Sequence, residues 1–322
     1  MKKLPIVVAA LAAALASVPV QSQTYPAKPV RLIVPFPPGG NTDTLGRIMA
    51  QKLSDAFSQQ FFVENRAGGA GVVGAEAAAK SPSDGYTIYF GTTGTLASAP
   101  ALQPRLAYDP VKSFAPISAL AVAPVVVMVR GELPVKSLRE FIEYAKARPG
   151  KLTYGSAGVG HFLHIAGEAF NAAAGVQLFH VPYKGVNQAL LDMLAGRLDV
   201  MMDTIVIYAP HVQDGKLKAL AVAQGRRLSS MPELPTTAEA GLPGYEFAAY
   251  FGLLAPAGVS SEIVRRLNAE VVKALGAPDL VGSLAKMGLE PHPTTPEQYA
   301  ALIAEEAARW KGLIARIGIK LE

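Results

Sequence analysis

Residues 30 to 49 read VRLIVPFPPGGNTDTLGRIM, and this stretch decides the fold class. The apolar run predicts a strand over 30–36, and the glycine pair after it predicts a tight loop. Apolar residues then recur at helical spacing over 41–57, where Asn41 or Thr42 is placed to cap the free amides of a helix. A strand, a glycine loop and an amphipathic helix form half of a βαβ unit, so the sequence predicts an α/β protein with a parallel sheet.

The same alternation recurs along the chain. Runs of β-branched and aromatic residues predict further strands over 61–64, 86–90, 125–129, 152–155, 178–181, 200–203 and 217–223. Helical spacing of apolar residues predicts helices that begin near 72 and that cover 137–147, 161–173 and 187–195. The last third predicts one strand over 247–254 and then helices over 260–275, 279–287 and 296–317.

A tail without a sheet of its own predicts that the chain leaves a first domain, builds a second one and returns. We place the crossings near 117–124 and 224–247. Domain 1 then comprises 24–120 and 247–322, and domain 2 comprises 121–246. Two consecutive domains followed by a helical tail are the alternative.

The N-terminal segment has the features of a secretory signal peptide. Two lysines precede an apolar stretch over 4–20, and small or polar residues follow it. We expect residues 1–23 to be removed, with cleavage within 16–23, and the protein to be periplasmic. A membrane anchor is the alternative, but the apolar run is short for a bilayer span.

Composition excludes several classes of function. The 322 residues contain no cysteine, which rules out thiol nucleophiles, thiolate zinc sites and iron–sulfur clusters. The net charge of +5 falls to +3 without the two lysines of the signal peptide, and the basic residues form no run. We therefore expect no nucleic-acid partner.

Clusters of glycine, serine and threonine stand between several predicted strands and the helices that follow. Such loops present peptide N–H groups and a helix N-terminus, so they attract anions. The first covers 35–43, where prolines stiffen the backbone and glycines allow close approach, and it lacks the lysine of a Walker loop. Its candidate ligand residues are Pro37, Pro38, Gly39, Gly40, Asn41 and Asp43. A tight structural turn is the alternative.

A second loop contains Gly69, Gly71 and Gly74 in the spacing G-x-G-x-x-G. A dinucleotide site needs an acidic residue about 20 positions further on, at the end of the next strand. The nearest candidate, Asp84, precedes that strand. We therefore expect no nucleotide, and no other cofactor.

Two more loops, over 91–95 and 154–161, carry hydroxyl groups next to glycines. The first directly follows a predicted strand, and the second opens a predicted helix. Their candidate ligand residues are Thr92 and Thr93 in the first loop, and Ser156, Gly158 and His161 in the second.

The loop over 154–161 has two alternative roles. Ser156 with His161 or His164 is compatible with a hydrolase, but a nucleophile elbow needs glycine at the position of Tyr154. His161, His164 and Glu168 are compatible with a metal site, but their spacing matches no strong motif. We favour a ligand-binding hydroxyl at Ser156 and expect no metal.

Two further strand ends carry polar residues. Tyr183 and Lys184 follow one predicted strand, and Asp203 ends another. Tyr183 and Asp203 are candidate ligand residues, while a capping role is the alternative for Asp203. Lys184 is a weaker candidate, because solvation explains an exposed lysine equally well.

A set of longer motifs runs through the mature chain in a fixed order. They are VPFPPGGNTD (34–43), NRAGGAGVVGAEAAAKSPSDGYT (65–87), YDPVKSFAPIS (108–118), LTYGSAGVGHFLHIAGEAF (152–170), VPYKG (181–185), LAGRLDVMMD (194–203), LPTTAEAGLPGYE (234–246) and FGLLAPAG (251–258). Together they resemble the solute receptors of tripartite tricarboxylate transporters, the Bug family. Each motif is modest alone, but the ordered set is specific.

The resemblance implies a two-domain type II periplasmic-binding-protein fold, or Venus flytrap. Its interdomain cleft closes on a small carboxylic acid solute and delivers it to the membrane components of the transporter. Loops that match 37–41 and 92–93 are expected to hold one carboxylate. The second domain is expected to contribute 156–161, Tyr183 and Asp203. We expect a monomer without catalytic activity.

The sequence does not determine the solute. The family spans dicarboxylates, tricarboxylates, acidic amino acids and aromatic acids. Asp203 suits a ligand hydroxyl or ammonium group, whereas a protonated His161 suits a second carboxylate. A periplasmic serine hydrolase that uses Ser156 and His161 is the alternative function. Trp310, the only tryptophan, is expected to lie far from the cleft and to respond weakly to ligand.

Overall fold

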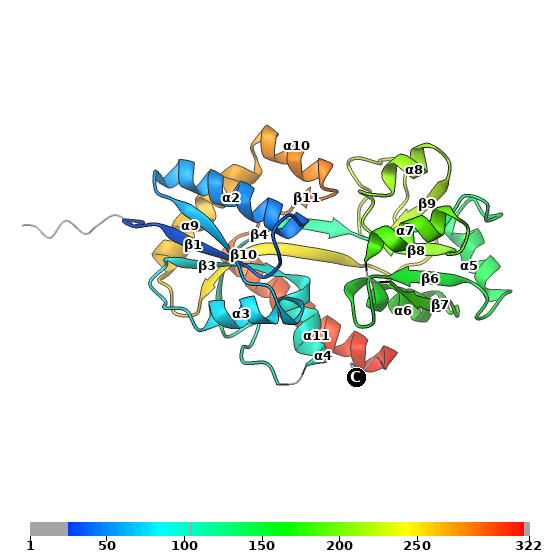
Figure 1. Cartoon of the computed structure of the whole chain (residues 1–322), viewed down its shortest axis with the longest axis horizontal. Helices are drawn as coiled ribbons and strands as arrows, with labels where there is room; N and C mark the ends of the chain where they lie inside the picture. The colour runs from blue at the N-terminus through cyan, green and yellow to red at the C-terminus, as the bar shows by residue number, and fades with distance from the viewer. Residues whose placement is uncertain (1–24, 104, 184, 319–322) are drawn as a thin grey trace, which may run out of the picture.

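The strands form two separate sheets in the computed structural model, which describes residues 25–318 except 104 and 184. One sheet has six strands in the order β11-β4-β10-β3-β1-β2, and the other has five in the order β7-β6-β8-β5-β9. Figure 1 shows the two halves side by side, which confirms the predicted two-domain α/β fold. The signal peptide predicted over 1–23 and the candidate Lys184 lie outside the described residues.

The first sheet combines early and late parts of the chain. Its strands are β1 (Val30–Val34), β2 (Phe61–Asn65), β3 (Thr87–Thr92), β4 (Phe114–Pro124), β10 (Ala248–Pro256) and β11 (Glu290–Pro291). β1 pairs in parallel with β2 and β3. β10 pairs antiparallel with β3 and β4, and β11 pairs antiparallel with β4. The late segment therefore completes a sheet that the early segment begins.

Helical segments of different lengths lie around the first sheet. They are α2 (Asn41–Phe57), η1 (Gly69–Gly71), α3 (Val72–Ala79), η2 (Gly94–Ser98), α4 (Ala99–Leu102), α9 (Ser261–Leu275), α10 (Pro278–Lys286) and α11 (Pro296–Ile317). On α2, Leu45, Met49 and Leu53 recur every four residues and are buried in one cluster with Leu267 and Val271 of α9. The predicted amphipathic stripe therefore forms the contact between these two helices.

The second sheet consists of residues from the middle of the chain. Its strands are β5 (Val126–Arg130), β6 (Thr153–Ser156), β7 (Phe179–Pro182), β8 (Val200–Asp203) and β9 (Leu217–Val222). Its helices are α5 (Leu138–Lys146), α6 (Phe162–Ala174), α7 (Val186–Leu194) and α8 (Ala209–Gln213). β7, β6 and β8 run in parallel, whereas β5 pairs antiparallel with β8 and β9. No helix in the described part of the chain has the length and apolar character needed to cross a membrane.

The two sheets meet where three segments exchange main-chain hydrogen bonds. The Val125 N–H donates to Phe247 O at 2.9 Å, the Phe247 N–H to Ala223 O at 2.8 Å, and the Ala223 N–H to Val125 O at 2.7 Å. β4 continues into β5 across Val125, and β10 starts directly after Phe247. The chain thus passes between the halves through strands that are bonded to one another, as Figure 1 shows.

The crossing predicted over 117–124 falls within strand β4, a conformation that the sequence pattern did not predict there. The stretch contains alanines and ends on Pro124, both of which are unfavourable in isolated strands. Its strand conformation is stabilised by antiparallel pairing with β10, from Ala248 opposite Pro124 to Pro256 opposite Phe114. This partner lies far away in sequence, so the local pattern does not indicate it.

The last helix, α11, supplies residues to the cores of both halves. Tyr299 and Ile303 belong to a cluster of the first sheet, together with Tyr89 of β3. Trp310, one to two turns before the end of α11, is fully buried and belongs to the main cluster of the second sheet. Its ring lies 5.3 Å from Phe247. The tail predicted to pack on domain 1 therefore also contacts the second half.

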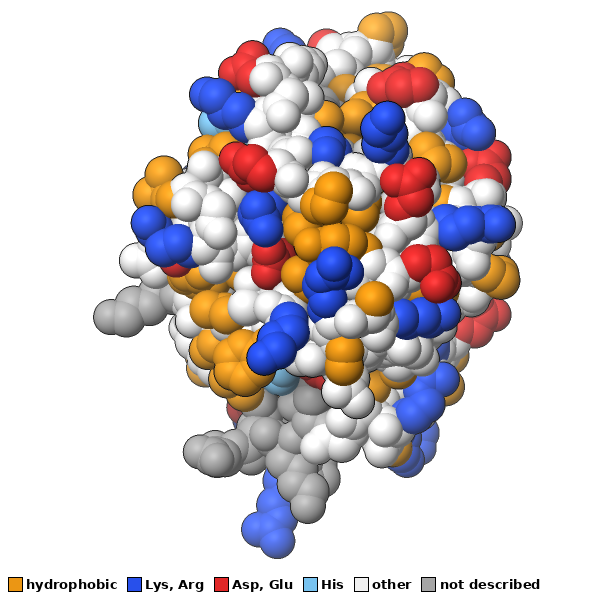
Figure 2. All heavy atoms as spheres, turned by 90° about the vertical axis from the view of Figure 1, so that its right-hand side faces the viewer, with side chains coloured by type: hydrophobic (Ala, Val, Ile, Leu, Met, Phe, Trp, Pro, Cys, Tyr) orange, Lys and Arg blue, Asp and Glu red, His pale blue; other side chains and the backbone are white. Residues whose placement is uncertain are grey.

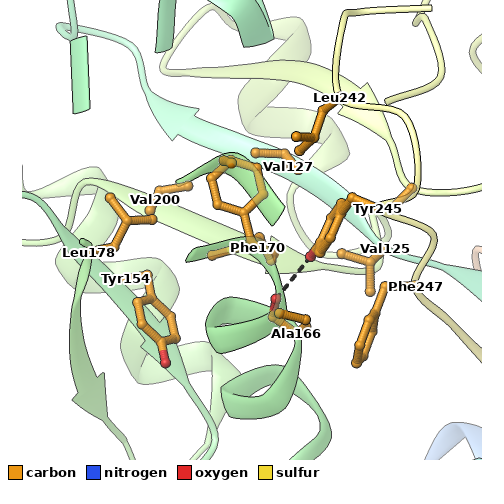
Figure 3. Packing of buried hydrophobic residues seen from close by; sticks show 14 of the residues in the cluster. Val125, Val127, Tyr154, Ala166, Phe170, Leu178, Val200, Leu242, Tyr245 and Phe247 are labelled. Carbon is orange, nitrogen blue, oxygen red and sulfur yellow. Dashed lines mark hydrogen bonds between the residues drawn. The ribbon is translucent and has the colours of Figure 1, made fainter. Parts of the chain in front are cut away.

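Figure 3 shows the core that Trp310 joins. This one cluster combines residues from three parts of the chain. They are Val125 between β4 and β5, Phe170 of α6, and Tyr245 and Phe247 just before β10. The Tyr245 hydroxyl donates to Ala166 O of α6 at 3.1 Å. The segment just before β10 is thereby fixed to α6.

Replacement of Trp310 by Ala is expected to lower the free energy of unfolding by about 3 to 5 kcal/mol, because it leaves a large cavity between α11 and the second sheet. Urea unfolding followed by circular dichroism measures the effect. Lys311→Ala, at an exposed position on the same helix, is the control and is expected to change stability by less than about 0.5 kcal/mol. A loss below about 1 kcal/mol for Trp310→Ala would contradict the bridging role.

Candidate functional site

The loops after β1, β2 and β3 lie at one edge of the first sheet. These strands are parallel, so their carboxyl ends point to the same side. The glycines after β2 pack directly on the other two loops. A Cβ atom at Gly71 would lie 2.7 Å from Thr95 Cγ2 and 3.4 Å from Pro35 Cβ, and one at Gly74 would lie 2.8 Å from Pro35 Cα. Close packing of three loops therefore explains the G-x-G-x-x-G motif.

The loop between β1 and α2 is exposed over 37–40 and is shaped from within by Asp43. The Gly39 N–H donates to Asp43 Oδ2 at 2.9 Å, and Asn65 Nδ2 donates to Oδ1 at 2.8 Å. Arg47 Nε donates to Oδ2 at 3.0 Å. Burial alone would raise the pKa of Asp43, but these three hydrogen bonds outweigh it and hold the pKa below its usual value.

Asp43 therefore forms a fixed part of the loop, and its charge is balanced by Arg47. The cap predicted at Asn41 or Thr42 is wrong, because the N-cap position is occupied by Gly40, which has no side chain. The first-turn amides of α2 point along the helix axis toward the loop. Such an N-terminus favours an anion.

The threonines after β3 hold their own loop in shape. Thr92 Oγ1 accepts the Thr95 N–H at 3.3 Å, and Thr93 Oγ1 accepts the Tyr250 N–H of β10 at 2.7 Å. Thr95 Oγ1 accepts the Tyr89 hydroxyl at 2.8 Å. Thr92, Thr93 and Thr95 are all buried. The sequence indicated Thr92 and Thr93 but not Thr95, whose role depends on contacts across the loop.

A second edge is formed by the carboxyl ends of β7, β6 and β8. Ser156 stands opposite Pro182 in the parallel pair of β6 and β7, and the Tyr183 N–H donates to Ser156 O at 2.9 Å. Asp203 ends β8, which is the other parallel neighbour of β6. The predicted residues Ser156, Tyr183 and Asp203 are therefore brought to one edge of the second sheet.

Ser156 is fully buried and its hydroxyl is engaged. Its Oγ lies 2.7 Å from His180 Nε2 and accepts the Gly158 N–H at 3.1 Å. The partner proposed for a hydrolase, His161 or His164, does not contact this hydroxyl. Their Nδ1 atoms instead accept the N–H groups of Leu163 at 3.2 Å and of Gly160 at 3.0 Å.

The hydrolase alternative therefore has no support in the geometry. The nucleophile is inaccessible, and within residues 25–318, apart from 104 and 184, no carboxylate is hydrogen-bonded to His180. Sequence reasoning missed His180 because a single histidine in a short strand matches no motif. The local signal is one polar side chain among the otherwise apolar residues of β7.

The polar groups proposed for a metal site are also engaged. Glu168 Oε1 accepts the Tyr154 hydroxyl at 2.5 Å. His161 caps α6 through its Nδ1 atom, so a protonated His161 would lose this hydrogen bond. Among the described residues no three His, Asp or Glu side chains lie close enough together to hold a metal ion.

Tyr183 and Asp203 differ in accessibility. The Tyr183 hydroxyl donates to Asp192 Oδ2 at 2.9 Å, and the residue is half-buried. Asp203 is buried and accepts the Thr204 N–H at 2.7 Å and the Tyr208 hydroxyl at 3.1 Å. Burial raises the pKa of Asp203 to about 6, although these two hydrogen bonds oppose the rise.

Trp310 lies close to the second edge, contrary to the prediction that it lies far from the ligand site. Its ring stacks on Phe162 at 5.7 Å, and Phe162 directly follows His161. The helical periodicity of α11 showed which face is apolar, but it did not show that this face extends into the second half. Trp310 therefore reports on the loop that ends at His161.

Exposure divides the candidate residues into two groups. Asp43, Thr92, Thr93, Ser156 and Asp203 are buried and hold the loops in shape. Pro37, Pro38, Gly39, Gly40 and His161 are exposed, and Gly158 is half-buried. The accessible surface of both edges is thus largely backbone, which suits an anionic ligand that accepts N–H groups.

Comparison with protein families assigns the chain. The model of the tripartite tricarboxylate transporter family receptor matches residues 45–319. The chain belongs to this family. It is a solute receptor, and the family resemblance seen in the ordered motifs is confirmed.

Several solved structures are similar to this chain over nearly its whole length. A protein from R. palustris, solved with adipate, is 37% identical, covers 92% of this chain and 99% of its own, and has a TM-score of 0.78. MatC from Rhodopseudomonas palustris, with bound malate, is 35% identical over 90% of this chain and 100% of its own, with a TM-score of 0.73. The periplasmic binding protein BugD is 31% identical over 92% and 100%, with a TM-score of 0.74.

Replacement of Asp203 by Asn is expected to raise the free energy of unfolding at pH 8 by about 1 to 3 kcal/mol. The pKa of about 6 in the folded receptor exceeds the unfolded value of about 3.9, so the folded state binds more protons between these values. The contribution of Asp203 to stability therefore falls as the pH rises from about 4 through about 6, and the variant lacks this contribution.

Urea unfolding at a series of pH values from about 4 to about 8 measures this difference. Asp214→Asn, at an exposed position after α8, is the control and is expected to follow the wild type. An Asp203→Asn variant with the same pH dependence as the wild type would show that this carboxyl is not perturbed by burial.

Proposed function

We propose that this receptor binds a small solute with at least one carboxylate, between the loop edges of its two sheets, and delivers it to the membrane components of a tripartite tricarboxylate transporter. The observation that carries the proposal is the exposed, glycine-bearing backbone at both edges, behind which the polar side chains are buried. The related structures with adipate and with malate support a carboxylate ligand.

One carboxylate is assigned to the first edge. The first-turn amides of α2 and the loop over 92–95 are the donors, while the Gly39 amide is already used by Asp43. The pairing of Asp43 with Arg47 neutralises a charge that would otherwise repel the ligand. This edge recognises only the carboxylate group of the solute, so it suits every carboxylic acid that receptors of this family bind.

The distal part of the solute is assigned to the second edge. His161 and Tyr183 offer accessible polar groups there, and the loop over 157–160 offers backbone amides. Asp203 lies buried behind this surface and holds the chain after β8 through the Thr204 N–H and the Tyr208 hydroxyl. A second carboxylate or a hydroxyl group on the solute suits this environment.

Further properties belong to the same proposal. The receptor is exported, loses residues 1–23 and acts as a periplasmic monomer without catalysis. Domain 1 comprises 24–120 and 247–322, and domain 2 comprises 121–246. The solute contacts both domains and stabilises the closed arrangement, because a ligand shifts such an equilibrium only through differential affinity.

The interspersed positive and negative side chains on the face in Figure 2 offer no uniform basic surface for nucleic acid.

Adipate and malate are expected to stabilise the receptor against unfolding and to change the emission of Trp310. At 100 times Kd, one site adds about 2.7 kcal/mol to the free energy of unfolding. The emission changes because closure alters the contact of Trp310 with Phe162, beside the proposed site. Thermal shift and fluorescence titration measure both effects.

The diamide of adipic acid is the control ligand, since it preserves shape but carries no charge. An esterase assay on the same preparation tests the alternative function. Equal stabilisation by the acid and by the diamide would contradict carboxylate recognition, and turnover that Ser156→Ala abolishes would contradict the assignment as a receptor without catalysis.

Replacement of Gly39 by Ala is expected to weaken binding of all acids by a similar factor of about 5 to 30. A Cβ at Gly39 meets no neighbouring atom, but the φ of +91° strains any other residue by about 1 to 2 kcal/mol and distorts the loop. Isothermal titration calorimetry with adipate and malate measures the change.

Gly150→Ala is the matched control, because Gly150 has a φ of +70° and equally open surroundings in a turn between α5 and β6. It is expected to cost similar stability and to leave Kd unchanged. If both variants bind normally, the carboxylate is held elsewhere than at the loop over 37–40.

A further inference from the structure

Two histidines, one buried and one half-buried, pack behind the loop over 156–161. His180 of β7 and His164 of α6 stack with ring centroids 3.9 Å apart and ring planes at 14°. Tyr154 of β6 also stacks on His180, at 4.9 Å and 26°. Rings from β6, β7 and α6 therefore meet at the base of this loop.

Each histidine holds a different part of the loop. His180 Nε2 lies 2.7 Å from Ser156 Oγ at the beginning of the loop. The Gly160 N–H near its end donates to His164 Nδ1 at 3.0 Å. Since the two rings are in contact with each other, they fix both parts of the loop relative to one another.

The loop depends on such fixation because its own conformation is unusual. Gly158 and Gly160 have φ values of +124° and +76°, and the loop contributes no residue to a helix or strand between Ser156 and Phe162. Val159 between them is 62% exposed. Glycines of this kind lose much conformational entropy on ordering, so side-chain contacts have to select the conformation.

The hydrogen bonds define the charge state of the pair. His164 Nδ1 accepts an N–H group, so its ring proton is on Nε2 and the ring is neutral. Burial, and next the neighbouring His164, lower the pKa of His180 to about 4, and burial also lowers the pKa of His164. The ionisable groups that face the pair are Tyr154 of β6 and Glu168 of α6. The Glu168 carboxylate favours a charged His164, but burial outweighs it.

We propose that His180 and His164 are positioning residues of the receptor, a stacked neutral pair that holds the loop over 156–161 in the conformation that receives the solute. This rests on the proposed function, which assigns the loop to the ligand. Neither ring contacts the solute. A proton on His164 Nδ1 removes the acceptor of the Gly160 amide, and a charge on either ring repels the other, so protonation frees the loop.

Nitrogen NMR of the histidine rings tests the pair without any ligand. In the receptor labelled with 15N-histidine, the rings of His164 and His180 are expected to be neutral at pH 5.5, where a solvated ring is mostly protonated. His164 is expected to carry its proton on Nε2. His164→Asn and His180→Gln identify the two signals. Ordinary titration of both rings near pH 6.5, or a His164 proton on Nδ1, would overturn the proposal.

Binding of adipate tests the effect on the site. His180→Phe keeps an aromatic ring for stacking but has no ring nitrogen to hydrogen-bond Ser156 Oγ, and it is expected to raise Kd about tenfold. His180→Gln places a polar atom near the position of Nε2, and it is expected to restore Kd to within about threefold. Equal Kd values for the wild type and a folded His180→Phe variant would overturn the proposal.

A second pair of variants keeps the test decisive if His180→Phe does not fold. His164→Leu removes the acceptor of the Gly160 amide, and His164→Asn replaces it with Oδ1. The leucine variant is expected to lose affinity for adipate and the asparagine variant to regain it. Equal affinity of the two would overturn the positioning role of His164.

The pH dependence of stability separates this proposal from the proposed function. The folded pKa of His180, about 4, lies below the unfolded value of about 6.5. The stability of the wild type relative to His180→Gln is therefore expected to fall as the pH falls from about 6.5 to about 4. If adipate and malate fail to bind while NMR and stability give these results, the assigned solute is wrong and the pair is real. If adipate binds and all variants match the wild type, the receptor function holds and the pair has no positioning role.

Discussion

The main-chain hydrogen bonds among Val125, Ala223 and Phe247 are the constraint on which the rest of the structure depends. They bring the end of β4, the end of β9 and the start of β10 to one point, so both sheets extend from a shared origin. Two side-chain contacts flank this point. Trp310 enters the second core, and buried Glu290 of β11 accepts Arg226 Nη2 and the Ser229 N–H, each at 3.1 Å.

The parts of the fold that depend on local periodicity could be predicted from the sequence. The helix over 41–57 and the strand over 200–203 have their predicted bounds, because an apolar stripe or run in each decides which side is buried. β4 could not be predicted as a strand, since its stability comes from pairing with β10. Helical spacing likewise identified α11 but not the core that Trp310 enters. The spacing shows which face of the helix is apolar, but it does not show which element packs on that face.

The sequence predicted the edges of the candidate site better than the roles of their residues. Parallel strands bring Ser156, Tyr183 and Asp203 together, which follows from the strand pattern alone. The use of each hydroxyl or carboxylate inside a loop depends on partners from other strands, such as His180 for Ser156 and Tyr250 for Thr93. Such partners are distant in sequence and belong to no motif.

The contribution of α11 to the second core also constrains how the chain folds during synthesis. Most of that core comes from residues 125–247, but Trp310, Leu313 and Ile314 complete it. The first sheet likewise needs β10 and β11 from the last quarter of the chain. Neither half can close its core while the ribosome still holds the last helix, so the nascent chain stays without a finished domain until translation is almost over. For the export that we propose, this delay keeps the chain unfolded for longer and so available for translocation.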